Sequence, residues 1–482
     1  MSSARDGAWS EGIVLMSWPR GCYRGVKLSL FDRARPGKKC LAQSVLQRLF
    51  LGKYSLFTLL IIAAVVRLDD ASVALEPTRS VTLTVAGFGH QVAEKLPSEG
   101  LSEFIRSTGI HVQFLPSWGN SADQLGVILR TLDRHFSTPD VYLIDVIWPG
   151  TLHQHLLDLG PYLESNPGQY LPELLKNDTV AGRIVSLPFY LNAGMLFYRT
   201  DLLRKYGYRQ PPASWDELEK MASHIQRGER ARGHNSFWGY VWQGGAYEGL
   251  TCNALEWQAS FGGGRIIEPN GTIHVNNPQT ASAFRMAAGW VGSISPPSVV
   301  SYTESDSLNV FRSGNAAFMR YWSSGYRANQ AADSDVRGRF NVTQLPTGPG
   351  GRAQSMGGFQ LAVSRYSAHP REAAELVEYL TSNKIQRLRA IQEGYLPTVT
   401  QLYSDADVLE AVPEATVFRN AGRESWIARP SSIAAAKYST LSKNYYETVH
   451  QILTGQSPPE KALNDLERAL VNLRINGVSS DR

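Results

Sequence analysis

Carboxylates, an amide and aromatic rings recur in this chain near the ends of predicted strands. Asp145 lies at the end of the apolar run 140–147, Asn192 interrupts a second apolar stretch, and Glu248 and Glu304 follow aromatic segments. Such groups form paired hydrogen bonds with hydroxyls, and charged acceptors form the stronger bonds. Paired carboxylates could also hydrolyse a sugar, but the sequence does not give the separation on which that chemistry depends.

Two of these residues have simpler interpretations. Asn192 lies in the middle of Leu187–Asp201 (LPFYLNAGMLFYRTD), which we predict to be a buried crossing strand. A buried amide without a partner costs about 1–3 kcal/mol, so Asn192 has either a backbone partner or a ligand. Asp145 is either an acid in a cleft or a residue that caps a helix or forms a turn.

The motifs of several catalytic and metal-binding classes are absent from the sequence. It contains no Gly-x-Ser-x-Gly elbow, no His-Glu-x-x-His, and no Walker or dinucleotide motif. The three cysteines, Cys22, Cys40 and Cys252, are too few for a zinc site built from paired Cys-x-x-Cys motifs. Polar and aromatic residues at loop ends therefore favour binding over catalysis, and we predict no metal and no cofactor.

The first 74 residues differ from the rest in charge. They contain 11 Lys+Arg and 5 Asp+Glu, which leaves 37 against 38 (48 less 11, 43 less 5) for the remainder. This near-neutral body lacks the basic surface of a nucleic-acid-binding protein. Arg48 and Lys53 precede the apolar run Tyr54–Val66, and the small residues Ser72 and Ala74 suit a signal peptidase.

We therefore predict that residues 1–74 form an N-terminal extension and export signal, and that the mature protein is periplasmic or extracellular. An uncleaved membrane anchor is the alternative. The apolar run of 13 residues is short for a membrane span, which needs about 20.

Strand and helix patterns alternate along the mature chain. Strands at 81–86, 110–115 and 140–147 are separated by helices around 92–107 and 124–135, an order that predicts a parallel α/β layer. Ligands of such layers bind at the carboxyl ends of the strands. Further predicted elements are a helix capped by Ser214, helices at 255–261, 280–293, 304–313, 370–380, 384–392 and 459–475, and strands at 316–322 and 360–364.

Several long motifs together resemble the extracellular solute-binding proteins of ABC sugar importers, in particular the trehalose/maltose-binding branch. The resemblance covers essentially all of the mature chain. It implies two α/β lobes made of discontinuous segments and joined by a hinge, with residues 77–190 plus 318–368 in lobe 1 and 191–317 plus 369–480 in lobe 2. The motifs are PDVYLIDVIWPG, LPFYLNAGMLFYRTDLLRKYGY, FWGYVWQGGAYEGLTCN, SPPSVVSYTESDSLNVFRSGNAAFMRYW and GGFQLAVSRYS.

The resemblance also implies which residues contact a ligand. Asp145 and Asn192 fall at positions that bind sugar hydroxyls, and Arg429 is either a cleft residue or a surface ion-pair partner. Relatives can carry an acid at the positions of Gln91 and Asn192, and tryptophan in place of Phe359, so the identity of the sugar stays open. The complete set of expected ligand contacts is Gln91, Asp145, Asn192, Trp242, Tyr247, Tyr302, Glu304, Trp322, Gly358, Phe359 and Arg429.

The function implied is that of a monomeric subunit that closes its lobes on a trehalose- or maltose-type disaccharide and delivers it to a membrane permease. Such a protein has no catalytic residue and binds no nucleic acid. Two alternatives remain: a carbohydrate-active hydrolase using Asp145, Glu248 or Glu304, and a binding protein for another solute such as an oligosaccharide or a polyol.

Overall fold

The computed structural model describes residues 81–87, 98–115, 121–422, 425–475 and 478–480. The predicted export signal in residues 1–74 and the candidate Gln91 lie outside these residues. The contacts divide the chain into two units, residues 1–76 and 77–482, and the elements below all belong to the second. Among the described residues, no helix combines the length and apolar character that crossing a membrane requires.

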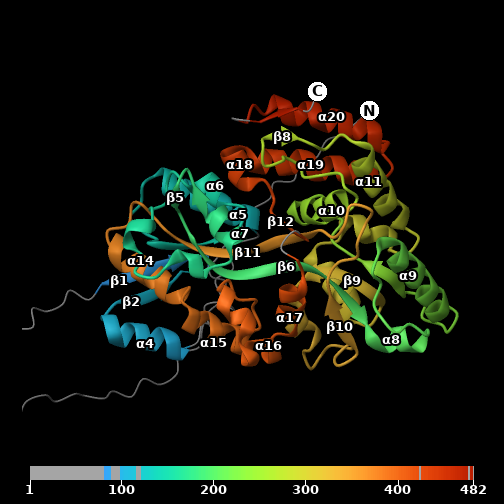
Figure 1. The fold of residues 1–482 in the computed structure, drawn as a ribbon, viewed down its shortest axis with the longest axis horizontal. Coiled ribbons are helices and arrows are strands. Elements are labelled where there is room, and N and C mark those ends of the chain that lie inside the picture. The colour runs from blue at the N-terminus through green and yellow to red at the C-terminus, as the bar shows by residue number, and fades with distance from the viewer. Residues whose placement is uncertain (1–80, 88–97, 116–120, 423–424, 476–477, 481–482) are drawn as a thin grey trace, which may run out of the picture. The chain divides into compact units, whose positions relative to one another are not determined.

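A mixed sheet runs through the second unit, and its two longest strands, β6 and β11, cross its centre (Figure 1). The strand order is β2-β1-β3-β11-β6-β9-β7, with β10 paired to β6 and β12 paired to β11. The strands are β1 (Thr82–Ala86), β2 (His111–Phe114), β3 (Val141–Asp145), β6 (Leu187–Arg199), β7 (Trp238–Val241), β9 (Ala316–Trp322), β10 (Phe340–Thr343), β11 (Gln354–Val363) and β12 (Trp426–Ile427), with the short pairs β4 (Thr179–Val180) and β5 (Arg183–Ile184), and β8 (Thr272–Ile273) and β13 (Ser479–Ser480).

Strand β6 belongs to both halves of this sheet. Residues 187–193 pair with β11, whereas residues 194–199 pair with β9 and β10. Strands β1, β2 and β3 are parallel, as predicted, and β11 runs antiparallel to β3 and β6. The register between β6 and β11 shifts near Pro188, which has no N–H to donate to the ladder. The crossing strand predicted from the sequence is thus confirmed, and two α/β lobes share it.

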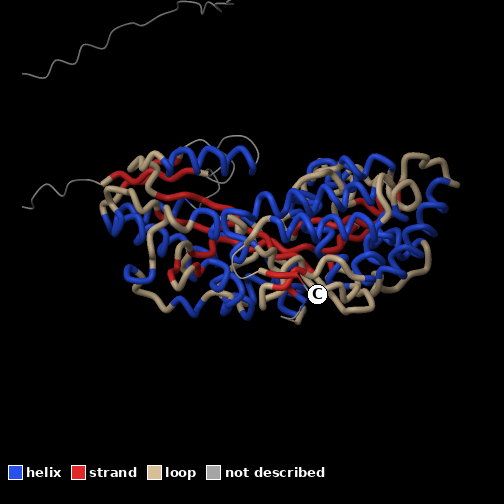
Figure 2. Tube along the Cα trace, turned by 90° about the horizontal axis from the view of Figure 1, so that it is seen from above, coloured by secondary structure: helices blue, strands red, loops and turns tan. Residues whose placement is uncertain are grey.

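Helices lie on both sides of the strands (Figure 2). Each helix buries an apolar face against the sheet or a neighbouring helix. The α-helices are α4 (Ser98–Thr108), α5 (Ser121–Asp133), α6 (Pro149–Leu152), α7 (Pro172–Asp178), α8 (Thr200–Lys205), α9 (Trp215–Arg230), α10 (Glu248–Ser260), α11 (Pro278–Trp290), α12 (Glu304–Arg312), α13 (Gly325–Asn329), α14 (Pro370–Leu380), α15 (Asn383–Glu393), α16 (Ala406–Ala411), α17 (Pro413–Asn420), α18 (Ser431–Ala434), α19 (Tyr438–Leu453) and α20 (Pro459–Asn472), and the 3₁₀ helices are η1 (Gly160–Tyr162), η2 (Pro167–Gln169), η3 (Pro297–Ser301), η4 (Thr400–Ser404) and η6 (Ala435–Lys437).

Most predicted elements are confirmed, and the N-cap of α9 is Ser214, whose hydroxyl accepts a hydrogen bond from the backbone N–H of Glu217 at 3.2 Å. One prediction was wrong. A helix was expected at 255–261, but α10 begins at Glu248 and ends at Ser260. Nearly every residue of α10 is buried, so tertiary packing overrides the weak helical preference of Gly249 and Thr251.

The lobe limits at 317/318 and 368/369 stay a prediction. Strand β9, which the first limit cuts, pairs along its length with β6 and β7. Helix α14, which follows the second limit, packs against β11, β6 and η1.

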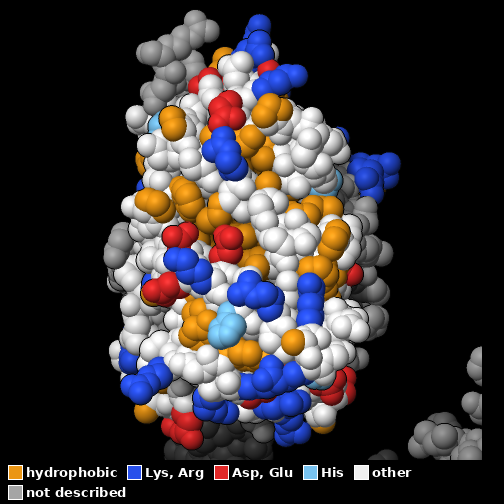
Figure 3. Space-filling view, turned by 90° about the vertical axis from the view of Figure 1, so that its right-hand side faces the viewer, with side chains coloured by type: hydrophobic (Ala, Val, Ile, Leu, Met, Phe, Trp, Pro, Cys, Tyr) orange, Lys and Arg blue, Asp and Glu red, His pale blue; other side chains and the backbone are white. Residues whose placement is uncertain are grey.

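A cluster of four fully buried tryptophans, Trp215, Trp242, Trp257 and Trp290, fills the core beside β7. Their ring centroids lie 5.0 Å (Trp242 to Trp257), 5.9 Å (Trp257 to Trp290) and 5.6 Å (Trp215 to Trp290) apart. On the surface at this end of the unit, basic and acidic side chains lie interspersed with apolar ones (Figure 3). The aromatic content of this half therefore belongs mainly to its core.

Candidate functional site

Asp145 is the last residue of β3, where its backbone pairs with Phe359 of β11. Its Oδ1 accepts a hydrogen bond from the N–H of Ile147 at 3.2 Å and lies 4.0 Å from Nη2 of Arg429. Burial raises the pKa of Asp145 to about 6, although the nearby guanidinium of Arg429 opposes this rise. Asp145 is therefore a carboxylate that is easily protonated and lies at the carboxyl edge of the parallel strands.

Arg429 pairs with Glu248 at the first turn of α10. Its Nη1 lies 2.7 Å from Oε1 of Glu248, and the arginine is only 6% exposed. The hydroxyls of Tyr438 and Ser442 also donate to Glu248, at 2.5 and 2.6 Å. Arg429 is thus a buried ion-pair partner rather than a surface one, and Glu248 is held by three donors at a helix N-terminus.

Glu304, the first residue of α12, holds two aromatic side chains. Its Oε2 accepts from the hydroxyl of Tyr247 at 2.6 Å, and its Oε1 accepts from Nε1 of Trp322 at 3.2 Å. The guanidinium of Arg320 lies 4.3 Å from the Trp322 ring centroid. Arg320 is in turn bound to the buried Glu256. The indole of Trp322 is therefore fixed in orientation before any ligand binds.

Asn192 lies opposite Gly357 in the pairing of β6 with β11. Its Oδ1 accepts from the Ser323 hydroxyl and from the Ser324 N–H, both at 3.3 Å. Its amide nitrogen makes no hydrogen bond with any residue that the structure describes. The oxygen of Asn192 therefore has protein partners, one of them a backbone N–H, and contact of its amide nitrogen with a ligand stays a prediction.

Phe359 stacks in a short row of aromatic rings. The centroid of Tyr190 lies 5.3 Å from that of Phe359 and 4.3 Å from that of Tyr395. Gly358 makes this arrangement possible, because its φ is +125° and an added Cβ would lie 2.3 Å from the carbonyl oxygen of Tyr190. Sequence reasoning did not select Tyr190 or Tyr395 as ligand contacts. Tyr190 lies within the apolar segment that was singled out, and Tyr395 directly follows Gly394.

These groups share one region, which we call the carboxylate–aromatic face: Asp145, Asn192, Glu304, Trp322 and Phe359. The charges of Glu248 and Glu304 both contribute to the raised pKa of Asp145, so the three carboxylates lie within electrostatic reach of one another. A Cβ on Gly357, the partner of Asn192, would lie 3.0 Å from the ring of Trp322. The face thus offers acceptors, an amide donor and flat rings together.

One predicted contact, Trp242, is not brought to this face. Trp242 is fully buried in the tryptophan cluster, where its Nε1 donates to the Ser295 hydroxyl at 3.0 Å. Its position is explained by packing, and the sequence pattern of aromatic residues did not distinguish core from cleft. The hydroxyl of Tyr302 accepts from Ser298 at 3.2 Å rather than from any member of the face. Gln91 lies outside the described residues.

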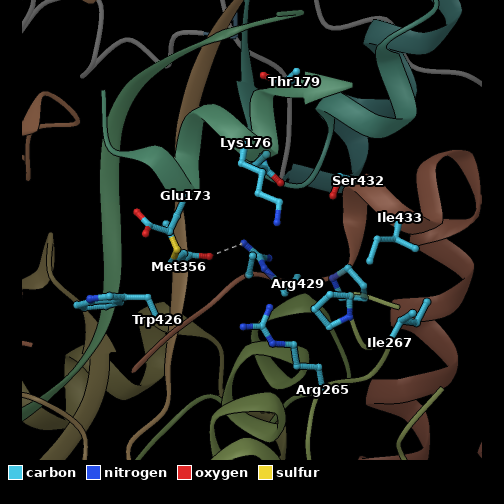
Figure 4. A pocket seen from close by; sticks show the side chains of 14 residues that line it. Glu173, Lys176, Thr179, Arg265, Ile267, Met356, Trp426, Arg429, Ser432 and Ile433 are labelled. Atoms are coloured by element: carbon cyan, nitrogen blue, oxygen red, sulfur yellow. Dashed lines mark hydrogen bonds between the residues drawn. The ribbon is translucent and has the colours of Figure 1, made fainter. Parts of the chain in front are cut away.

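A cavity of about 420 Å³ is lined in part by Arg429 and Met356 and by no member of this face. Its other walls come from α7, from residues 265–269, and from β12 with the segment that follows it (Figure 4). Among the described residues, no group of three or more His, Cys, Asp or Glu side chains is placed to hold a metal ion.

Comparison with known proteins assigns the chain to a family. Residues 91–387 match the family described as bacterial extracellular solute-binding protein. The chain belongs to this family. A probable ABC transporter-binding protein of Deinococcus radiodurans is 42% identical over 425 residues, which cover 86% of this chain and 99% of that protein.

Solved structures of family members share the fold. Maltose-bound MalE3 of T. maritima is 33% identical, with a TM-score of 0.73, over 82% of this chain and all of that one. A solute-binding protein of Thermotoga lettingae bound to α-D-tagatose is 22% identical, with a TM-score of 0.71 and the same coverage. The chain is therefore a two-lobe solute-binding protein of the ABC transporter type.

Proposed function

We propose that this protein is the substrate-binding subunit of an ABC importer and that it binds a disaccharide of the trehalose or maltose type on the carboxylate–aromatic face. The observation that carries the proposal is the hydrogen bond from Nε1 of Trp322 to the carboxylate of Glu304, which holds the indole beside that carboxylate. An indole held beside carboxylates can cover the apolar C–H face of a sugar while the carboxylates accept its hydroxyl hydrogen bonds. The 33% identity to maltose-bound MalE3 supports the same ligand class.

Each member of the face has a separate role in this proposal. Asp145 accepts hydroxyl hydrogen bonds as a carboxylate, and Asn192 donates from its amide nitrogen. Trp322 and Phe359 bound the sugar with their rings, and Gly358 lets β11 approach β6 closely enough to place them. Arg429 neutralises part of the charge of Asp145 and Glu248, which favours an uncharged ligand over a cationic one.

Binding then drives delivery. A ligand held by residues from β3 and from the β9 side of the sheet stabilises the closed arrangement of the two lobes. The closed protein presents both lobes to a membrane permease, outside the cytoplasm, after export through the N-terminal segment. The protein acts as a monomer in this scheme and leaves the sugar chemically unchanged.

Calorimetric titration of the mature protein with maltose, trehalose, tagatose and mannitol tests the proposal. We expect saturable micromolar binding of one disaccharide and weaker binding of the monosaccharide and the polyol. The bound sugar should be recovered intact. Binding of none of these ligands, or release of monosaccharide from a disaccharide, would contradict the proposal, whereas preference for mannitol would move the substrate class to polyols.

A further inference from the structure

The cavity beside Arg429 lies on the other side of β11 from the carboxylate–aromatic face. Side chains alternate between the two faces of a strand. Gly357 faces the ring of Trp322, so its neighbour Met356 points the opposite way, and Met356 lines the cavity. The cavity is thus a second compartment rather than an extension of the proposed sugar site, and nothing assigned so far accounts for it.

Three cationic side chains converge on this cavity. Figure 4 shows the ammonium group of Lys176 and the guanidinium group of Arg265 directed toward Arg429 from opposite sides. The side chains of Lys176 and Arg265 make no hydrogen bond or ion pair with any residue that the structure describes. Glu173 is the one acid among the described residues of the lining, and its carboxylate points away from Lys176 (Figure 4).

Arg429 adds a buried donor that lacks an acceptor. Its Nη1 binds Glu248, and its Nη2 lies 3.4 Å from the Met356 carbonyl oxygen. Its Nε is buried, and no described residue accepts a hydrogen bond from it. A buried donor of a charged group without an acceptor is unfavourable, and native proteins rarely leave one in that state. The arrangement therefore calls for an acceptor that the described part of the chain does not supply.

The remaining walls are apolar. Trp426 and Ile267 are almost fully buried, and Ile433 forms an exposed part of the rim. A volume of about 420 Å³ is within the range of small-molecule sites and exceeds what a single inorganic ion fills. Cations at one point and apolar walls around them suit a molecule with one anionic group and an apolar body.

We propose that this cavity is a binding site for a small organic anion. Lys176, Arg265 and Arg429 hold its carboxylate or phosphoryl group through charge-assisted hydrogen bonds. Its apolar body packs against Trp426 and Ile267. This site does not depend on the identity of the sugar, nor on whether the carboxylate–aromatic face binds a sugar at all.

The test is calorimetric titration of the mature protein, without sugar, with phenyl phosphate and with benzoate. Inorganic phosphate and benzyl alcohol serve as probes of the anionic group alone and of the apolar body alone. We expect at least one of the two organic anions to bind at least tenfold more tightly than either partial probe, and added salt to weaken that binding. The anion that binds more tightly identifies the head group.

Lys176→Met and Arg265→Met remove a charge and keep an unbranched apolar stem. Each should weaken binding of the organic anion at least tenfold, with circular dichroism and melting temperature unchanged. Lys220→Met is the matched control, because Lys220 is an exposed cation of α9 away from the cavity. The proposal would be overturned if neither organic anion binds, or if the Lys176 and Arg265 variants bind the anion as tightly as the unmodified protein does. Tighter binding of benzyl alcohol than of both organic anions would also overturn it.

Discussion

Two tryptophans among the described residues carry an arginine over the ring, and only one of them lies on the proposed site. The guanidinium of Arg320 is 4.3 Å from the Trp322 centroid, and that of Arg230 is 4.2 Å from the Trp238 centroid. Trp322 is held in addition by Glu304. Comparing Trp322 with Trp238 therefore distinguishes the contribution of a cation–π contact to stability from the contribution of an indole ring to ligand affinity.

Trp322→Ala should weaken sugar binding by about 1–3 kcal/mol, in the range that loss of an aromatic stacking platform costs elsewhere. Trp238→Ala loses an equivalent cation–π contact and should leave the sugar affinity unchanged. Calorimetry on both variants, with urea unfolding as a check of stability, makes the comparison. An equal loss of affinity in the two variants would place the ligand elsewhere.

The raised pKa of Asp145 predicts how binding depends on pH. Its folded-state pKa is about 6, against an ordinary value of 3.8, so Asp145 becomes protonated as pH falls through 6. A protonated carboxyl is the weaker acceptor, so sugar affinity should fall between pH 7 and pH 5. In Asp145→Asn this dependence should disappear, and a flat profile in the unmodified protein would contradict the assignment.

The same shift sets the sign of a stability effect. Burial disfavours the charged form, so Asp145 costs no stability below pH 3.8, costs more as pH rises toward 6, and costs a constant amount above. Asp145→Asn should therefore be more stable than the unmodified protein at pH 7, by up to about 3 kcal/mol. Urea unfolding at pH 4 and pH 7 should show the gain only at the higher pH.

At the scale of elements, β11 can pass close to β6 only because residue 358 is glycine. Gly358→Ala would force a Cβ to within 2.3 Å of the Tyr190 carbonyl oxygen at a φ of +125°. Gly351→Ala is a matched control, because Gly351 also has a positive φ, +109°, but has nothing within 4 Å. We expect the control to cost about 1 kcal/mol and Gly358→Ala to cost at least twice that in urea unfolding.

The parallel strands and the crossing strand could be predicted because their patterns are local. Apolar runs bounded by glycine or proline gave β1, β2, β3 and β9 within one or two residues. The start of α10 could not be predicted, because that helix is set by burial on all sides. The failure for Trp242 has the same cause, since a buried indole and a ligand-facing one look alike in sequence.

The residue types of the candidate site could be predicted from the sequence, but the hydrogen-bond and ion-pair partners of these residues could not. The sequence pointed to Asp145, Asn192, Glu304 and Trp322, but their partners lie far away in the chain. Arg429 is 181 residues from Glu248, and Trp322 reaches Glu304 only because β9 ends beside α12. The cations of the second cavity could not be predicted for the same reason, since Lys176 and Arg265 belong to no common motif.

At the scale of the molecule, one hydrogen bond joins the segment after β3 to the C-terminal segment. The hydroxyl of Thr151 in α6 donates to the Ala435 carbonyl oxygen at 3.1 Å. Residues 431–437 lead into α19, which packs on α10 and α11 beyond the crossing strands. On the predicted lobe limits this bond joins lobe 1 to lobe 2, and we predict that it forms only in the closed arrangement.

Thr151→Val should remove this bond while keeping the shape of the side chain. Loss of about 1 kcal/mol from the closed form should weaken sugar binding about fivefold and increase the radius of gyration of the protein without sugar. Thr131→Val is the control, because the Thr131 hydroxyl bonds to Val127 within α5 and spans no lobes. Calorimetry and small-angle scattering of both variants measure the difference, and identical behaviour would show that this contact does not govern closure.

The tryptophan cluster has a spectroscopic consequence. Trp215, Trp242, Trp257 and Trp290 are all fully buried in the half of the unit that contains β7, so intrinsic emission reports chiefly on that half, whereas circular dichroism sums the helices of both. Because β6 and β11 run without interruption through the two halves, a melt followed by emission and one followed by ellipticity should share a single midpoint. Two separate midpoints would instead show that each half unfolds independently.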